Sequence, residues 1–190
     1  MSTTPTDTIC YWIDAQDRIV EVNESWSKFA LENGGEALTG NRILGLNLWS
    51  CMADSTQREL YRQLATLARQ GRPVRFTYRC DAPRFCRLFE MQIHEEKNNL
   101  LKFTSTLKWQ ESRAAVPLLD SQVARNLDFV RVCSWCQRIA VGSQWLPVEA
   151  AVEAMGLMQA PTLPALTHGI CEDCLSKMMG KIRRLQRSIA

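Results

Sequence analysis

Hydrophobic and polar positions alternate through the middle of the chain, and short runs of strand-forming residues lie near its start. Alternation with a period of two is typical of a strand that buries one face. The pattern predicts short strands at residues 8–13 and 18–23, and longer strands at 74–80, 85–94 and 100–109.

Two segments between these strands have the spacing of amphipathic helices. The first contains Trp26 and is ended by Gly34. The second begins at a capping-box pattern, Thr56 with Glu59, and stops at Gly71. Its apolar stripe consists of Leu60, Tyr61, Leu64, Leu67 and Ala68. Two strands, helices and then three strands predict an α+β fold with an antiparallel sheet.

Several short motifs in this part of the chain resemble a PAS domain, a small sensor module common in bacterial signalling. The motifs are Ile13-Asp14 with Arg18-Ile19-Val20, Asn23-x-x-Trp26-x-x-Phe29, and Gly45-Leu46-Asn47-Leu48-Trp49. The resemblance covers residues 8–109 and implies a sensor domain.

The motifs of two cofactor-binding PAS subclasses are missing. The flavin subclass needs a reactive cysteine directly after an Asn, whereas here Cys51 follows Asn47 at a distance. A familiar haem arrangement uses a histidine on the long helix, and residues 56–70 contain none. His94 falls on the polar face of its strand. No specific PAS ligand is therefore predicted.

Two Cys-x-x-Cys pairs, separated by 34 residues, stand out in the last third of the chain. Each pair can direct two sulfurs at one ion, and two pairs supply the four thiolates that tetrahedral zinc prefers. A β-hairpin is predicted directly after the first pair, and a helix beginning near Glu172 at the second. Knuckle, hairpin and helix are the order of a treble-clef-like zinc module. The predicted metal ligands are Cys133, Cys136, Cys171 and Cys174.

Other ligand sets and ions stay open. His168 is a fifth candidate ligand, expected beside the site or on the nearby surface, with a three-cysteine, one-histidine site as the alternative. Iron bound in the rubredoxin manner would use the same cysteines as zinc. A c-type haem is excluded because Gln137 and Leu175 stand where a histidine is required.

A second resemblance concerns the cysteine pairs themselves. Cys-Ser-Trp-Cys-Gln-Arg-Ile at 133–139 and Leu-x-x-x-Thr-His-Gly-Ile-Cys-x-x-Cys at 163–174 resemble a recurrent C-terminal module of uncharacterised bacterial signalling proteins. This resemblance implies a signalling context and no defined reaction.

A loss of the strand pattern and Pro117 place a domain boundary after the last predicted strand. The predicted division is a PAS-like domain at 8–109, a linker at 110–132 and a four-cysteine zinc-binding module with a C-terminal helix at 133–190. Within the linker, Asp120 predicts the cap of a short helix with Leu127 on its apolar side.

The C-terminal helix combines an apolar stripe with a basic face. The stripe consists of Leu175, Met178, Ile182, Leu185 and Ile189, and the basic residues are Lys177, Lys181, Arg183, Arg184 and Arg187. The stripe favours packing against the module, with a homodimer as a further option. The basic face favours solvent exposure, and nucleic acid is its alternative partner.

Composition narrows the function. Among 190 residues the net charge is +3, and 46% of the residues are hydrophobic, which is typical of a folded soluble protein. The polar start lacks a secretory signal and no apolar run is long enough for a bilayer span, so we expect a cytoplasmic protein with no membrane partner. Eight cysteines in a reducing compartment indicate metal or redox chemistry.

No nucleophile with a matching base and no phosphate-binding loop is present, so we do not expect an enzyme. The sequence predicts a non-catalytic sensory or regulatory protein in bacterial signalling that acts through contacts with a signalling partner. The alternatives are a thiol-based redox sensor that uses the cysteine pairs and a nucleic-acid-binding regulator that uses the basic helix.

Overall fold

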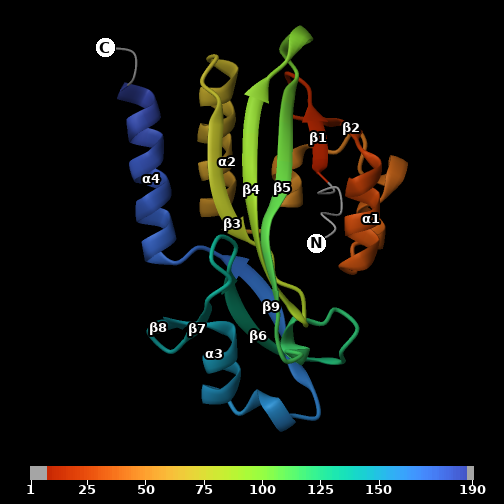
Figure 1. The fold of residues 1–190 in the computed structure, drawn as a ribbon, viewed down its shortest axis with the longest axis vertical. Helices are drawn as coiled ribbons and strands as arrows, with labels where there is room; N and C mark the ends of the chain where they lie inside the picture. The colour runs from red at the N-terminus through yellow and green to blue at the C-terminus, as the bar shows by residue number, and fades with distance from the viewer. Residues whose placement is uncertain (1–7, 188–190) are drawn as a thin grey trace, which may run out of the picture.

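The computed structural model describes residues 8–187. A larger body contains a five-stranded sheet, and a smaller body below it contains a four-stranded sheet (Figure 1). The last helix leaves the smaller body and runs back alongside the larger one (Figure 1). We call the larger body the PAS-like region, and the smaller body together with the last helix the cysteine module.

The PAS-like region is an antiparallel sheet in the order β2-β1-β5-β4-β3. The strands are β1 Ile9–Ile13, β2 Ile19–Val22, β3 Val74–Arg79, β4 Phe85–Glu95 and β5 Leu101–Ser112. The predicted alternation holds in β3, where Val74 and Phe76 are buried and Arg75 and Thr77 are exposed. The predicted α+β class with an antiparallel sheet is confirmed.

Helices α1 (Glu24–Glu32) and α2 (Ser55–Arg69) lie between β2 and β3 in the chain. The predicted start of α2 at Thr56 is wrong, because Asp54 caps the helix through its side chain, which accepts from the Gln57 N–H at 2.6 Å. The predicted apolar stripe of α2 is buried in full. Short 3-10 turns occupy Glu36–Leu38, Gly40–Arg42, Leu48–Cys51, Lys97–Asn99, Pro117–Leu119 and Leu157–Gln159.

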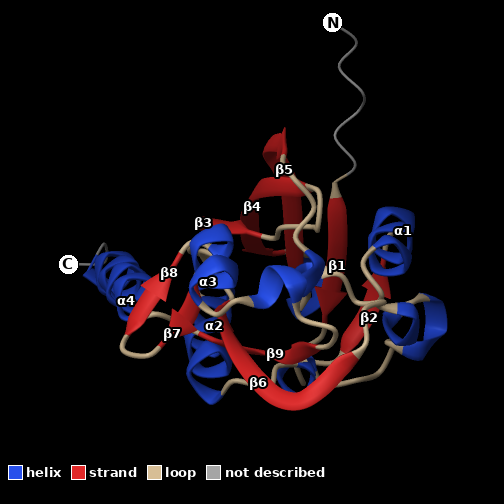
Figure 2. Ribbon diagram, turned by 90° about the horizontal axis from the view of Figure 1, so that it is seen from below, coloured by secondary structure: helices blue, strands red, loops and turns tan. Residues whose placement is uncertain are grey.

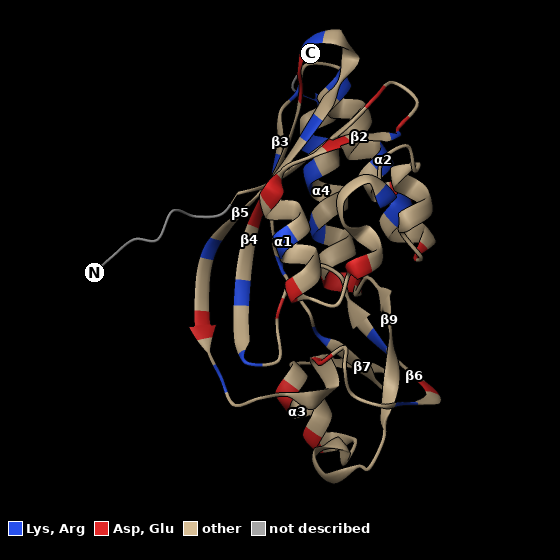
Figure 3. Ribbon diagram, turned by 90° about the vertical axis from the view of Figure 1, so that its right-hand side faces the viewer, with Lys and Arg blue, Asp and Glu red and all other residues tan. Residues whose placement is uncertain are grey.

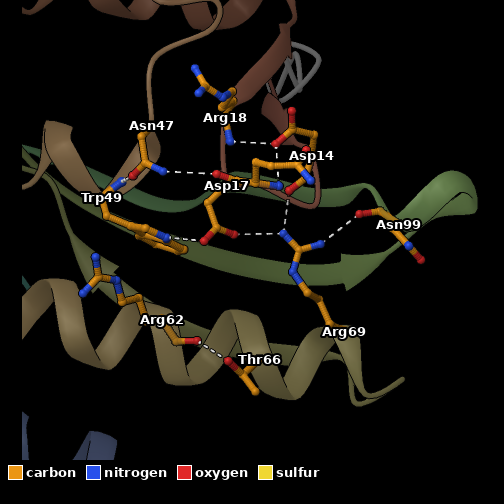
Figure 4. A network of polar contacts seen from close by, with 10 residues as sticks. Asp14, Asp17, Arg18, Asn47, Trp49, Arg62, Thr66, Arg69 and Asn99 are labelled. Atoms are coloured by element: carbon orange, nitrogen blue, oxygen red, sulfur yellow. Dashed lines mark hydrogen bonds and ion pairs between the residues drawn. The ribbon is translucent and has the colours of Figure 1, made fainter.

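Two of the three motifs that resemble a PAS domain, those around Asp14 and Asn47, meet in one polar network (Figure 4). The Asp17 carboxylate accepts from Trp49 Nε1 at 2.6 Å and from Arg69 at 2.9 Å. Arg69 also donates to the carbonyls of Asp14, at 2.6 Å, and Asn99, at 2.8 Å. Residues distant in sequence thus tie two turns of the sheet to the end of α2.

The second sheet has the order β8-β7-β6-β9, with β6 and β9 parallel. Its elements are β6 Arg125–Cys133, β7 Ile139–Val141, β8 Gln144–Leu146 and β9 Leu163–Gly169, with α3 Val148–Ala154 before β9 and α4 Glu172–Arg187 after it. Figure 2 shows β6 as a strongly curved strand beside β9. The knuckle, the hairpin and the helix from Glu172 are present as predicted, and α3 and β9 are additional elements.

The helix predicted after Asp120 is wrong, since that segment forms β6. Val130 and Val132 are buried in the core of the module, whereas Leu127 is 95% exposed and Phe129 is 72% exposed. The apolar residues of this segment therefore lie on two faces of a strand. The segment forms a strand because it pairs with β9, which follows about 30 residues later in the sequence and is not visible to a local pattern.

The predicted division at 110–132 stays a prediction, and secondary structure crosses both of its boundaries. β5 continues to Ser112, and β6 runs from Arg125 into the first metal-ligand candidate, Cys133. Leu118 of the same segment is buried in the core of the cysteine module. Within residues 8–187, no helix has the length and apolar character needed to cross a bilayer.

One hydrophobic cluster joins the two bodies. It combines residues of the PAS-like sheet and α2, such as Phe76 and Tyr61, with Cys133, Trp135 and Ile182 of the cysteine module. A second cluster lies wholly below the first sheet and packs α3 against β6 and β7. The four-cysteine site is therefore built at the junction of the two bodies.

Candidate metal centre

The first cysteine pair lies in a tight turn at the end of β6. The Cys133 N–H donates to the Arg138 carbonyl at 2.8 Å, and the Gln137 N–H donates to the Cys133 carbonyl at 2.9 Å. Gln137 has a φ of 62°, in the left-handed region that allows the chain to turn back sharply. This geometry turns Cys133 and Cys136 toward the same point.

The second pair is delivered by β9 and α4. Because β9 runs parallel to β6, Gly169 lies opposite Cys133, and the Ser134 N–H donates to the Gly169 carbonyl at 2.9 Å. Cys171 directly precedes α4, and its carbonyl accepts the Leu175 N–H at 2.9 Å. Cys174 lies in the first turn of the helix, where the helix dipole stabilises negative charge.

The four sulfurs form one cluster. The Sγ atoms of Cys133, Cys136, Cys171 and Cys174 all lie within 4.8 Å of one another. The Cys136 and Cys171 sulfurs are 3.7 Å apart, far more than the ~2 Å of a disulfide. Four sulfurs at ~2.3 Å from a tetrahedral ion would be separated by about 3.8 Å. The donor set and its spacing therefore fit a tetrahedral metal ion.

Charge in this cluster is strongly coupled. A hydrogen bond donated by the Cys136 thiol, supported by backbone N–H donors, lowers the pKa of Cys133 to about 4. The same hydrogen bond raises the pKa of Cys136 far above its usual range. Burial, followed by the charge on Cys133, raises the pKa of Cys174 to about 12. Without a cation, the Cys133 thiolate keeps Cys136 and Cys174 protonated, and a divalent cation among the sulfurs would favour the thiolate form of these ligands.

The surroundings of the cluster are largely closed. Cys133 and Cys171 are buried, and Cys136 and Cys174 are half-buried. The Cys171 N–H points to the Cys133 sulfur at 3.4 Å, a contact that stabilises a thiolate. A four-thiolate site without an open position is typical of structural rather than catalytic metal.

His168 lies outside the cluster. Its side chain is exposed on β9 and lines a hollow with Ser134, Gln137 and Cys51. Partial desolvation of the ring by its surroundings lowers the pKa of His168, which keeps the imidazole neutral near pH 7. The structure therefore does not bring His168 together with the four cysteines, and its role as an alternative ligand stays a prediction.

Trp135 connects the first cysteine pair to the larger body, a contact that the sequence pattern did not predict. It lies between the first two cysteines, and its carbonyl accepts the Arg79 N–H of β3 at 2.8 Å. Its ring is 5% exposed and lies 5.4 Å from the ring of Tyr61 and 6.0 Å from that of Phe76. The position of the tryptophan inside Cys-x-x-Cys was visible in the sequence, but its contact with β3 was not.

A buried ion network also connects the two bodies. The Asp81 carboxylate is fully buried and pairs with Arg79 and, at 3.3 Å, with Arg113. Arg113 in turn pairs with Glu149 of α3 at 2.8 Å. The burial of Asp81 places this network at the junction of the two bodies.

No protein-family model and no curated protein sequence matches this chain. A solved domain of an HTR-like protein from Haloarcula marismortui is 16% identical over 55% of this chain and 100% of its own, with a TM-score of 0.37. A sensory box sensor histidine kinase from Vibrio cholerae is 11% identical over 54% of this chain and 82% of its own, with a TM-score of 0.38. TM-scores this low carry no inference about function.

Proposed function

We propose that this chain is a non-catalytic regulatory protein of a bacterial signalling system, in which the PAS-like region is coupled to a structural zinc module. Four cysteine sulfurs in one closed cluster support the metal. Zinc is proposed because four thiolates with no open position suit a structural zinc ion, which has no redox chemistry of its own. The bound ion would fix the β6 turn to the start of α4.

The observation that carries the coupling is the hydrogen bond between the cysteine turn and the sheet edge. The Trp135 carbonyl, between two proposed ligands, accepts from Arg79 at the end of β3. Displacement of the turn would therefore pull directly on the edge strand of the PAS-like sheet. On this proposal, a change in either region alters the surface that a partner protein contacts.

Hydrogen exchange of the metal-loaded and chelator-treated protein tests this coupling. We expect metal removal to reduce amide protection in the cysteine turn, in α4 and in β3 (Val74–Arg79). Strand β2, at the opposite edge of the sheet, is the internal control and should keep its protection. Unchanged protection in β3 after complete loss of metal would contradict the proposal.

A thiol-based redox sensor is the second candidate, favoured by one distance. The Cys136 and Cys171 sulfurs belong to different pairs and lie only 3.7 Å apart. Peroxide could oxidise these two thiolates to a disulfide, with the two electrons reducing the peroxide to water and the metal leaving the site. Zinc released by low peroxide doses, measured with a zinc-sensitive dye, would favour this function, whereas full retention of zinc would remove it.

A further inference from the structure

A groove runs between the free edge of the PAS-like sheet and α4. It encloses about 590 Å³. Its sheet side is formed by Arg75, Thr77 and Arg79 of β3, and its helix side by Met178 and Lys181 among others. β3 is the last strand of the sheet, and Figure 1 shows α4 standing beside it. An extended element and a helix therefore face each other across an open space.

The edge of β3 presents backbone groups to this groove. The Cys80 N–H points inward to Arg87 of β4, whereas the Arg79 N–H points outward to Trp135. Backbone groups alternate along a strand, so the N–H and C=O groups of Thr77 and Arg75 point outward as well. Within residues 8–187, no partner on that side is found for these groups. The edge thus offers donors and acceptors at strand spacing.

The charge of the groove is strongly positive. Basic residues recur along α4 (Figure 3), and Lys177 and Lys181 are one helical turn apart on the groove side. In the described part of the chain, neither lysine forms an ion pair, and the nearby Asp173 pairs with Arg138 instead. Arg75 adds a further charge, and the acid that lines the groove, Glu90, lies 3.9 Å from it. An occupant with several negative charges is favoured.

We propose that this groove binds an extended acidic peptide segment of a partner protein, which adds as a strand to β3. Phosphate groups, free or in nucleic acid, only accept hydrogen bonds, so they leave the outward carbonyls of Arg75 and Thr77 without a donor. A peptide strand supplies both donors and acceptors, and its carboxylates can reach Lys177 and Lys181. This inference rests on the proposed function only in assuming that the chain acts in signalling. It adds the chemical nature of the partner, an acidic peptide.

Fluorescence anisotropy with the metal-loaded full chain and a short labelled peptide of alternating Glu and Thr tests the inference. We expect binding that weakens as salt rises, because the charges are exposed. A Gln-Thr peptide should bind at least about tenfold more weakly. No binding of the Glu-Thr peptide at low salt overturns the inference.

Two charge reversals on the same helix locate the site. Lys177→Glu with Lys181→Glu should weaken binding at least about tenfold, because both lysines line the groove. Arg183→Glu with Arg187→Glu is the matched control, since both arginines are exposed and neither lines the groove; it should change binding less than about twofold. Equal losses in both pairs would assign the binding to general charge and overturn the proposal.

A backbone variant tests strand addition. Thr77→Pro removes one outward N–H without removing a bond to β4, and proline is tolerated at sheet edges. It should weaken peptide binding at least about tenfold, whereas Thr77→Val, which keeps the N–H, should not. Equal binding by both variants excludes strand addition.

An oligonucleotide probe distinguishes the competing partner. A labelled single-stranded oligonucleotide that binds more tightly than the Glu-Thr peptide would overturn the proposal in favour of nucleic acid. If the peptide does not bind but metal removal still reduces the protection of β3, the proposed peptide groove is rejected and the proposed function is retained. The opposite result, peptide binding without coupling of metal to β3, rejects the proposed function and leaves the groove.

Discussion

The two bodies of this chain are stabilised in different ways. The PAS-like region has a core rich in aromatic rings, including the stacked pair Tyr11 and Phe103 with ring centroids 4.6 Å apart. The cluster beneath it, around α3 and β6, contains only aliphatic side chains, such as Val132 and Ile139. Aromatic side chains bury large areas each, so we expect hydrophobic burial to supply most of the stability of the upper body.

The lower body compensates for its small core with the four-cysteine cluster and with contacts to its neighbour. Small modules that cannot bury enough apolar surface commonly depend on a metal ion. Trp135 and Ile182 of the cysteine module are buried in the upper cluster and not in the lower one. The difference indicates that metal binding and docking onto the PAS-like region together hold the module in place.

Removal of one metal ligand should have the largest effect on the difference in stability between the two bodies. Cys136→Ser should abolish stable metal binding and unfold the module from Cys133 onward, because structural zinc contributes about 10–16 kcal/mol in small modules. The PAS-like region should remain folded with lower stability. Limited proteolysis with mass spectrometry reports both regions. Cys51→Ser, at an exposed cysteine outside the cluster, is the control; a protease-resistant module in Cys136→Ser would refute structural metal.

Loss of the Trp135 ring, which packs the cysteine module against the PAS-like region, should have the next largest effect on stability. Trp135→Ala should destabilise the metal-loaded protein by about 3–5 kcal/mol, because a large buried ring between Tyr61 and Phe76 is lost. Denaturant unfolding measures the change. Trp109→Ala, at a ring that is 45% exposed, should cost much less. Equal costs for the two variants would show that Trp135 does not join the bodies.

The ion network gives a comparable effect by a different mechanism. Asp81→Asn should cost about 3–5 kcal/mol, because it removes the buried carboxylate that pairs with the buried guanidinium of Arg113 and the half-buried one of Arg79. Asp173→Asn, at a largely exposed partner of Arg138, should change stability by less than about 1 kcal/mol. Similar unfolding midpoints for Asp81→Asn and the wild type would remove the network from the account.

Loss of the contact between α4 and the upper cluster should have the smallest of these effects. It separates the contribution of docking from that of metal binding. Ile182→Ala should cost about 2–5 kcal/mol, since the side chain is 1% exposed in the shared cluster. The expected signature is faster hydrogen exchange in α4 with metal content unchanged. Arg183→Ala, at the next and exposed position, serves as the control. Loss of metal in Ile182→Ala would mean that docking and metal binding are not separable.

Sequence patterns correctly predicted those elements that are determined by residues close together in the chain. Alternation in β3 and the stripe of α2 are properties of short windows, and the spacing of Cys133 and Cys136 constrains two sulfurs directly. The gathering of both cysteine pairs followed from the ligand number that zinc prefers. These expectations needed no knowledge of distant contacts.

Features that depend on distant contacts were missed or misassigned. β6 was predicted as a helix because its parallel partner β9 lies beyond α3. Burial of Asp81 depends on Arg113, which a sequence window does not connect to it. The contact of Trp135 with β3 depends on how the two bodies meet. In each case tertiary pairing overrides the local pattern.

The metal content of protein purified without oxygen, measured by elemental analysis together with an absorption spectrum, tests the central claim most directly. The account predicts about one zinc per chain and no visible bands. Iron with visible thiolate bands would contradict the assignment of zinc. A folded cysteine module with no metal at all would contradict the structural role of the four cysteines.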